Sequence, residues 1–120
     1  MFEWRSWMLF SKEAIQELAF QIILYAGNAR SSAMEAIHFA KAYRFENARC
    51  KIKECEVELL KVHREQTKLL KAEADGLLVD HTLILIHAQD HLMNAMTVKE
   101  LATEMIEMYE RIQKLEVKQS

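Results

Sequence analysis

The sequence contains no proline and only two glycines, Gly27 and Gly76. Proline is the residue that most strongly interrupts a helix, so its absence leaves long helices unbroken. Two glycines are too few for a sheet whose strands are joined by many tight turns. The length of 120 residues is close to the commonest size of one domain. These absences favour a single all-α domain.

A strong charge of one sign and a long apolar run are also lacking. The chain has 16 basic and 18 acidic residues, so its formal net charge of −2 gives no sign of a nucleic-acid-binding face. No segment reaches the roughly 20 apolar residues that span a bilayer. Residues 1–10 hold no uninterrupted apolar stretch long enough for a signal peptide. We therefore expect a cytoplasmic protein that binds no nucleic acid.

Cysteine is scarce, and the two cysteines do not suit a disulfide. Cys50 and Cys55 lie five residues apart in a stretch with helical spacing, so they point to different faces. A disulfide between them would distort the helix. We expect two free thiols in a reducing compartment.

Apolar residues recur at intervals of three and four along most of the chain, which indicates helices. The first helix is predicted to follow Ser11, a residue type that caps helix N-termini. The second runs from about Phe45 to Ala74 and ends at the turn signal Asp75-Gly76. The third is predicted to start near Asp80, another N-cap candidate, and to end near Leu115.

Each predicted helix carries a stripe of residues expected to face the core. Small residues of the first helix (Ala26, Gly27, Ala29 and Ala33) are predicted to let another helix approach closely. Four polar residues of the third helix interrupt its stripe and form a polar seam: His87, Asp90, Asn94 and Thr97. Buried polar groups are costly unless they are paired. Such a seam indicates a functional site, an oligomer axis, or both. The stripe of the first helix comprises Ile15, Leu18, Ala19, Ile22, Ile23, Ala26, Ala29, Ala33, Ile37 and Ala40. That of the second comprises Phe45, Ala48, Ile52, Cys55, Leu59, Val62, Gln66 and Leu70. That of the third comprises Leu83, His87, Asp90, Asn94, Thr97, Leu101, Met105, Met108, Ile112 and Leu115.

A cluster of polar residues in the third helix is the main candidate site. Residues three and four apart share a helix face, so His87, Asp90 and His91 come together while Gln89 points away from His87. Three interpretations stay open at this point. The first is a metal site, because two histidines at i and i+4 match helical zinc-ligand spacing. The second is a nucleophilic histidine. The third is that His87 is a hydrogen-bonded core residue. Zinc hydrolysis is the weakest, because no third ligand or substrate cleft is evident.

The remaining histidines are less informative. His38 closes a Glu35-x-x-His38 pattern of the kind found in di-iron bundles, but a second copy is absent. His63 lies at the edge of the second stripe and is expected near the third-helix site. We interpret both as partly exposed helix residues, and His81 as a surface residue.

One segment of the third helix resembles a known signature. Ile86-His-Ala-Gln-Asp-His-Leu-Met93 is similar to the motif of the lactose/cellobiose-type enzyme IIA component of the bacterial phosphoenolpyruvate-dependent sugar phosphotransferase system. Tyr25-Ala-Gly-Asn-Ala-Arg-Ser31 and Gln66-Thr-Lys-Leu-Leu70 agree with the same family. The resemblance extends from about Ser11 to about Lys114 without obvious gaps.

The resemblance implies a fold and an activity. The fold is an antiparallel three-helix bundle over residues 11–120 that assembles as a homotrimer of nine helices. His87 accepts phosphate from phospho-HPr, the phosphocarrier protein, and passes it to the cysteine of the sugar-specific enzyme IIB. Asp90 from three subunits meets at the trimer axis around a divalent cation, expected to be Mg2+. The membrane is reached only indirectly, through the transporter subunit.

Some features are assigned only in outline. The form His-Ala-Gln-Asp-His is closer to the cellobiose/chitobiose branch, which implies uptake of a β-disaccharide such as cellobiose. His91 is a candidate helper that orients His87 or holds the phosphoryl oxygens, and Gln66 and Gln89 are candidates for contacts with a neighbouring subunit. Residues 1–10, with two tryptophans, match no part of the family and are interpreted as an extension, either a flexible arm or a docking surface. The alternative function is a non-catalytic helical interaction module.

Overall fold

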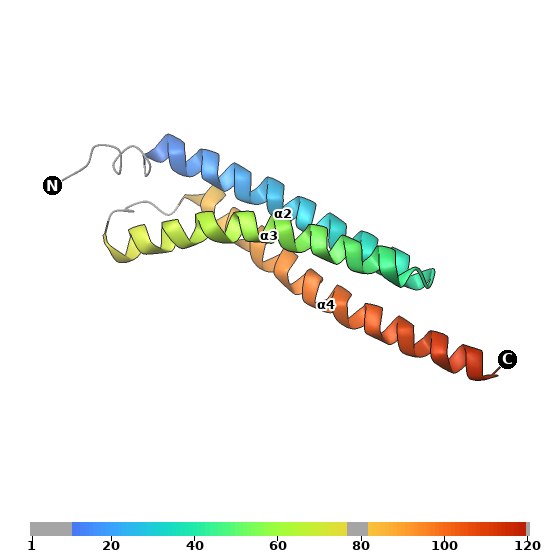
Figure 1. Cartoon of the computed structure of the whole chain (residues 1–120). Helices are drawn as coiled ribbons and strands as arrows, with labels where there is room; N and C mark the ends of the chain where they lie inside the picture. The colour runs from blue at the N-terminus through green and yellow to red at the C-terminus, as the bar shows by residue number, and fades with distance from the viewer. Residues whose placement is uncertain (1–10, 77–81, 120) are drawn as a thin grey trace.

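The computed structural model describes residues 11–76 and 82–119, and three helices account for nearly all of them (Figure 1). They are α2 (Lys12–Lys41), α3 (Phe45–Ala74) and α4 (Leu83–Gln119). The predicted N-cap Asp80, the histidine at 81 and the extension 1–10 lie outside the described residues. No described helix has the length and apolar character needed to cross a membrane.

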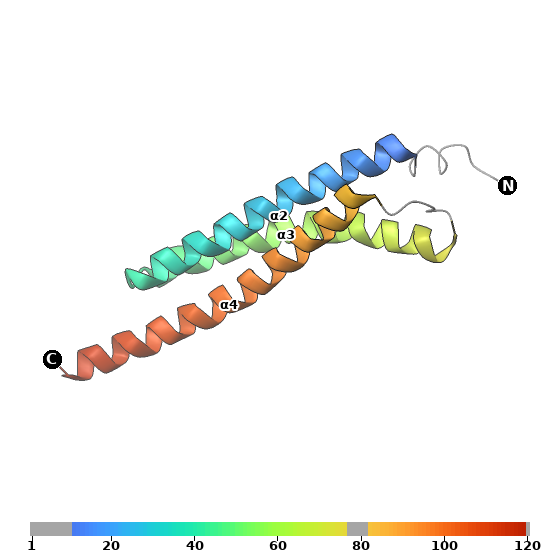
Figure 2. The same cartoon turned by 180° about the vertical axis from the view of Figure 1, so that it is seen from behind.

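The helices run up, down and up along one long axis (Figures 1 and 2). α2 and α3 lie side by side and antiparallel, and α4 runs in the same direction as α2. The C-terminal part of α4 diverges from the other two helices and extends past the turn that joins them. The predicted antiparallel three-helix architecture is therefore confirmed, with α2 packed against both neighbours.

The helix ends follow local chemistry that the sequence largely indicates. The Ser11 hydroxyl accepts a hydrogen bond from the backbone N–H of Ala14 at 3.3 Å, as a side-chain N-cap does. At the start of α4 the Thr82 hydroxyl accepts the backbone N–H of Leu85 at 3.2 Å. α3 ends where predicted, because Gly76 adopts a left-handed φ of 76° that glycine tolerates without a Cβ clash. α4 begins at Leu83, after the predicted start near Asp80, and its last turn continues to Gln119, beyond the predicted end near Leu115.

Alanine dominates the buried face of α2, and the core is built around it. Five alanines between positions 26 and 40 are at most 1% exposed and pack with Ala48, Cys55, Ala102 and Ile106 in one cluster near the α2–α3 turn. A second cluster towards the other end holds larger side chains. The predicted close-packing stripe of α2 is confirmed with one exception. Gly27 is exposed and a Cβ there would meet nothing within 4 Å, so it has no packing role.

The core stripe predicted for α4 is wrong. Leu83, Leu101 and Leu115 are 81%, 52% and 60% exposed, and the whole predicted stripe faces outward. The face that packs against the hairpin is offset from it and contains smaller side chains. Three alanines on this face let α4 approach the alanines of α2 closely, and the leucine and isoleucine side chains between them fill the remaining space. In α3 the same kind of shift leaves Leu69 buried in place of Leu70. The buried residues of α4 are Leu85, Ala88, Leu92, Ala95, Ala102 and Ile106.

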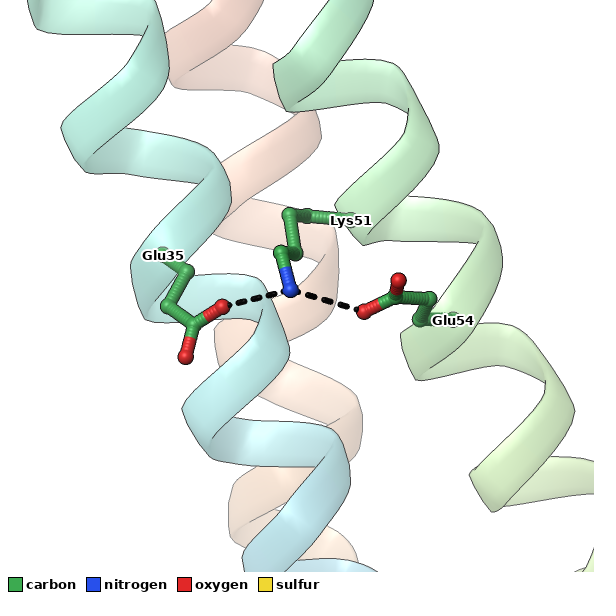
Figure 3. A network of polar contacts seen from close by, with 3 residues as sticks. All are labelled: Glu35, Lys51 and Glu54. Atoms are coloured by element: carbon green, nitrogen blue, oxygen red, sulfur yellow. Dashed lines mark hydrogen bonds and ion pairs between the residues drawn. The ribbon is translucent and has the colours of Figure 1, made fainter.

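Ion pairs at the surface tie the helices together. Lys51 of α3 donates to Glu35 of α2 at 2.8 Å and to Glu54 of its own helix at 3.0 Å (Figure 3). The hydrogen bond to Glu35, followed by that to Glu54, raises the pKa of Lys51. Lys99 of α4 pairs with Glu56 of α3 at 3.4 Å. Exposed ion pairs of this kind contribute little to the free energy of unfolding. Their main effect is on how the helices are aligned with one another.

Replacing a core alanine with a large residue tests the packing. Ala33 is fully buried in the alanine-rich cluster, so Ala33→Leu should lower the free energy of unfolding by about 1–3 kcal/mol through overpacking. The matched control is Ala74→Leu, because Ala74 is exposed in the last turn of α3. Urea denaturation followed by circular dichroism measures both. Equal stability of Ala33→Leu and the parent would contradict the tight alanine packing.

Candidate functional site

Two histidine side chains meet on α4. The Nε2 atoms of His87 and His91 are 3.1 Å apart, within hydrogen-bonding distance. Their rings are nearly perpendicular, with an interplanar angle of 87° and centroids 4.5 Å apart. His87 is exposed and His91 is half-buried. One ring nitrogen can therefore donate to the other, and one side of the His87 ring stays open to solvent.

The helix itself fixes this geometry. Leu85, Ala88 and Leu92 are buried in the cluster that contains Ile22 and Val62, so this stretch of α4 is anchored to both other helices. His87 precedes the buried Ala88 by one position, and its side chain is exposed on the outer side of the helix. The hypothesis that His87 is a core histidine is wrong, because His87 lies on that outer side.

Asp90 is also exposed on α4. It belongs to the same outward stripe as His87, Asn94 and Leu101, so the polar seam predicted for the core is a polar band on the outer surface. Among residues 11–76 and 82–119, no three His, Cys, Asp or Glu side chains gather closely enough to hold a metal ion. One chain contributes one carboxylate here, a hard oxygen donor of the type that Mg2+ prefers.

Gln89 lies next to the histidine pair in sequence but serves a different contact. Its side-chain carbonyl accepts a hydrogen bond from Nε2 of Gln66, which joins α3 to α4. Both residues are half-buried. This contact lies within the chain, and the expected contact of either residue with a neighbouring subunit stays a prediction. No pattern in the sequence reveals the pairing, because it depends on the register between two helices.

A shallow groove runs between α3 and α4 beside the site. It has a volume of about 240 Å³ and is walled by Leu59 and His63 on α3 and by Leu92, Met96 and Lys99 on α4. His63 thus lines the same groove as Leu92, the residue that follows His91 in the chain. His63 and His38 are both exposed helix residues, as predicted.

Both cysteines are free thiols, as expected. Cys50 is exposed, whereas Cys55 is buried in the cluster near the α2–α3 turn. Burial raises the pKa of the Cys55 thiol to about 11, so it stays protonated and a poor nucleophile at neutral pH. The cluster around Cys55 contains none of the residues that anchor the histidine pair. The Cys55 thiol therefore lies in a different part of the core from the segment that carries the histidine pair.

Comparison with known proteins identifies the family. Residues 17–110 match the family described as "PTS system, Lactose/Cellobiose specific IIA subunit". The chain belongs to this family. The lichenan-specific phosphotransferase enzyme IIA component of Bacillus subtilis (strain 168) is 54% identical over 100 residues, which cover 83% of this chain and 91% of that protein. Like its relatives, this IIA chain is a component of a phosphotransferase.

Two solved IIA structures share the fold. The cellobiose-specific enzyme IIA from Bacillus anthracis has a TM-score of 0.81 and 42% identity, covering 87% of this chain and 94% of that one. A solution structure of the chitobiose IIA–HPr complex from Escherichia coli has a TM-score of 0.73 and 35% identity, covering 82% and 96%. The resemblance seen in the sequence is confirmed.

Proposed function

We propose that this IIA chain carries a phosphoryl group on His87, taking it from phospho-HPr and giving it to the cysteine of an enzyme IIB during uptake of a β-disaccharide such as cellobiose. The observation that carries this proposal is the exposed His87 ring, which is held on a rigid helix and paired with a second histidine. Membership of a phosphotransferase family supports the activity. A relative studied in complex with HPr supports the donor.

The proposed chemistry needs only a lone pair on an imidazole nitrogen. A neutral imidazole protonates only one of its two nitrogens, so the other keeps a lone pair that can attack phosphorus. A new N–P bond forms on His87 while the N–P bond of the donor breaks and its electron pair returns to the donor imidazole. In the second step the N–P bond on His87 breaks and an S–P bond forms on the thiolate of enzyme IIB. Both steps depend on positioning more than on acid–base chemistry.

His91 has a positioning role in this proposal. In the unphosphorylated chain it contacts Nε2 of His87, which limits rotation of the acceptor ring. After transfer, an N–H of His91 can donate to a phosphoryl oxygen. The half-buried His91 ring is more constrained than the exposed His87 ring, so it suits a supporting function.

We further propose that two other copies of the chain pack against the outward face of α4 in a homotrimer and leave the His87 ring accessible to its partners. Large apolar side chains on this face are exposed in the single chain, and exposed patches of this kind mark interaction surfaces. Asp90 lies on the same face, and its counterparts would meet around a divalent cation, expected to be Mg2+, which offsets their mutual repulsion. The exposed residues are Leu83, Met93, Leu101, Met105, Met108, Ile112 and Leu115.

Phosphorylation of single-histidine variants tests the carrier role. With phosphoenolpyruvate, enzyme I and HPr, the parent chain should gain an acid-labile, base-stable phosphate, and His87→Ala should gain none. The matched control is His38→Ala, which removes another exposed helix histidine and should be labelled as the parent is. Equal labelling of His87→Ala would place the acceptor elsewhere. No labelling of the parent would favour a non-catalytic interaction module.

Removal of the Asp90 carboxylate tests the cation. In the parent, EDTA should lower the melting temperature of the assembly, because three uncompensated carboxylates repel one another. Asp90→Asn should contain less bound Mg2+ by elemental analysis, and EDTA should no longer change its melting temperature. Asp75→Asn, at the exposed end of α3, is the control and should behave as the parent does. Unchanged metal content in Asp90→Asn would refute the assignment.

A further inference from the structure

We propose that His87 and His91 also form a two-ligand site for a borderline transition-metal ion such as Zn2+, and that an ion bound there blocks the phosphate acceptor. The site differs from the proposed Asp90 site in its ligands, which are imidazole nitrogens and not carboxylate oxygens. The blocking effect rests on the proposed function, whereas metal binding does not. The histidine pair would then make the carrier sensitive to free zinc.

The distance between the two nitrogens supports chelation. With Zn–N bonds of about 2.0–2.1 Å, two nitrogens 3.1 Å apart subtend an angle of about 98° at a shared ion, close to the tetrahedral value of about 109°. The two Nε2 atoms thus lie at nearly the same distance in the hydrogen-bonded pair as they would when both bind one ion. The exposed His87 ring has room to turn its lone pair towards a common point with His91.

The helix supplies the pre-organisation. The histidines are one turn apart on a segment anchored by Ala88 and Leu92, so the second nitrogen binds at high effective concentration once the first is bound. Imidazole nitrogen favours Zn2+, Cu2+ and Ni2+ over Mg2+. Because no third His, Cys, Asp or Glu joins the pair in the described residues, water would complete the coordination.

Metal binding and phosphorylation would compete for one ring. An ion on Nε2 of His87 removes the lone pair that this nitrogen needs for attack on phosphorus. It also withdraws electron density from Nδ1 of the same ring, so either nitrogen becomes a weaker nucleophile. By thermodynamic linkage, phosphorylation of His87 must in turn weaken zinc binding. The phosphorylated chain should therefore bind Zn2+ more weakly than the unmodified chain does.

Isothermal titration of the full chain with Zn2+ tests the site. We expect one ion per chain in the parent, and about 100-fold weaker binding in His91→Ala and in His87→Ala, since each loses the chelate. His38→Ala, which removes an exposed histidine elsewhere, should bind as the parent does. Imidazole 15N spectra should show Zn2+ shifting the Nε2 signals of both histidines. Equal affinity of the parent and His91→Ala, or loss of binding in Asp90→Asn with His91→Ala unaffected, would overturn the site.

Transfer from purified phospho-HPr tests the blocking effect separately. Zn2+ should slow labelling of the parent, excess EDTA should restore it, and the same concentration of Mg2+ should not slow it. A transfer rate that is unchanged while titration shows the site filled would overturn the blocking effect. Failure of the zinc-free parent to accept phosphate would instead overturn the proposed carrier function, and the titration would still decide the metal site.

Discussion

The rest of the structure depends on one constraint, which is that the helices approach closely at the buried alanine face of α2. α2 buries Ala26, Ala29, Ala33, Ala36 and Ala40 almost completely, and small residues of α3 and α4 pack in the same cluster. Alanine has a high helix propensity and loses no side-chain entropy on burial, so it favours both the helix and the close contact. The larger buried side chains lie mainly in the second cluster, towards the other end of the bundle. The outer face of α4 carries further large apolar side chains that are exposed in the single chain.

α4 therefore has two different faces from Leu85 to Ile106, the part that packs against the hairpin. The inner face fixes the helix against the hairpin through Ala88, Leu92 and Ala102, and the outer face carries the histidine pair among exposed apolar residues. A rigid anchor directly behind an exposed imidazole suits a group that must meet different protein partners in turn. The same outer face offers the surface on which copies of the chain are proposed to associate.

Much of the fold could be predicted from the sequence, because helix spacing, caps and the Asp75-Gly76 break are local signals. The core face of α4 could not, because both of its faces carry apolar residues at helical spacing, and the choice depends on the size of the residues in α2. At the site, the i, i+4 spacing predicts that His87 and His91 share a face. The contact between their Nε2 atoms depends on side-chain rotamers, and the Gln66–Gln89 link depends on the α3–α4 register, which sequence spacing does not specify.

Methionine oxidation by dilute peroxide most directly tests whether the outer face of α4 is covered in the native protein. Met105 on this face and Met34 on α2 are almost equally exposed in the single chain, at 36% and 38%, so they form a matched pair. If copies of the chain cover α4, peptide mass spectrometry should show Met105 oxidised several-fold more slowly than Met34, with equal rates in denaturant. Equal rates in the native protein would contradict a covered α4 face.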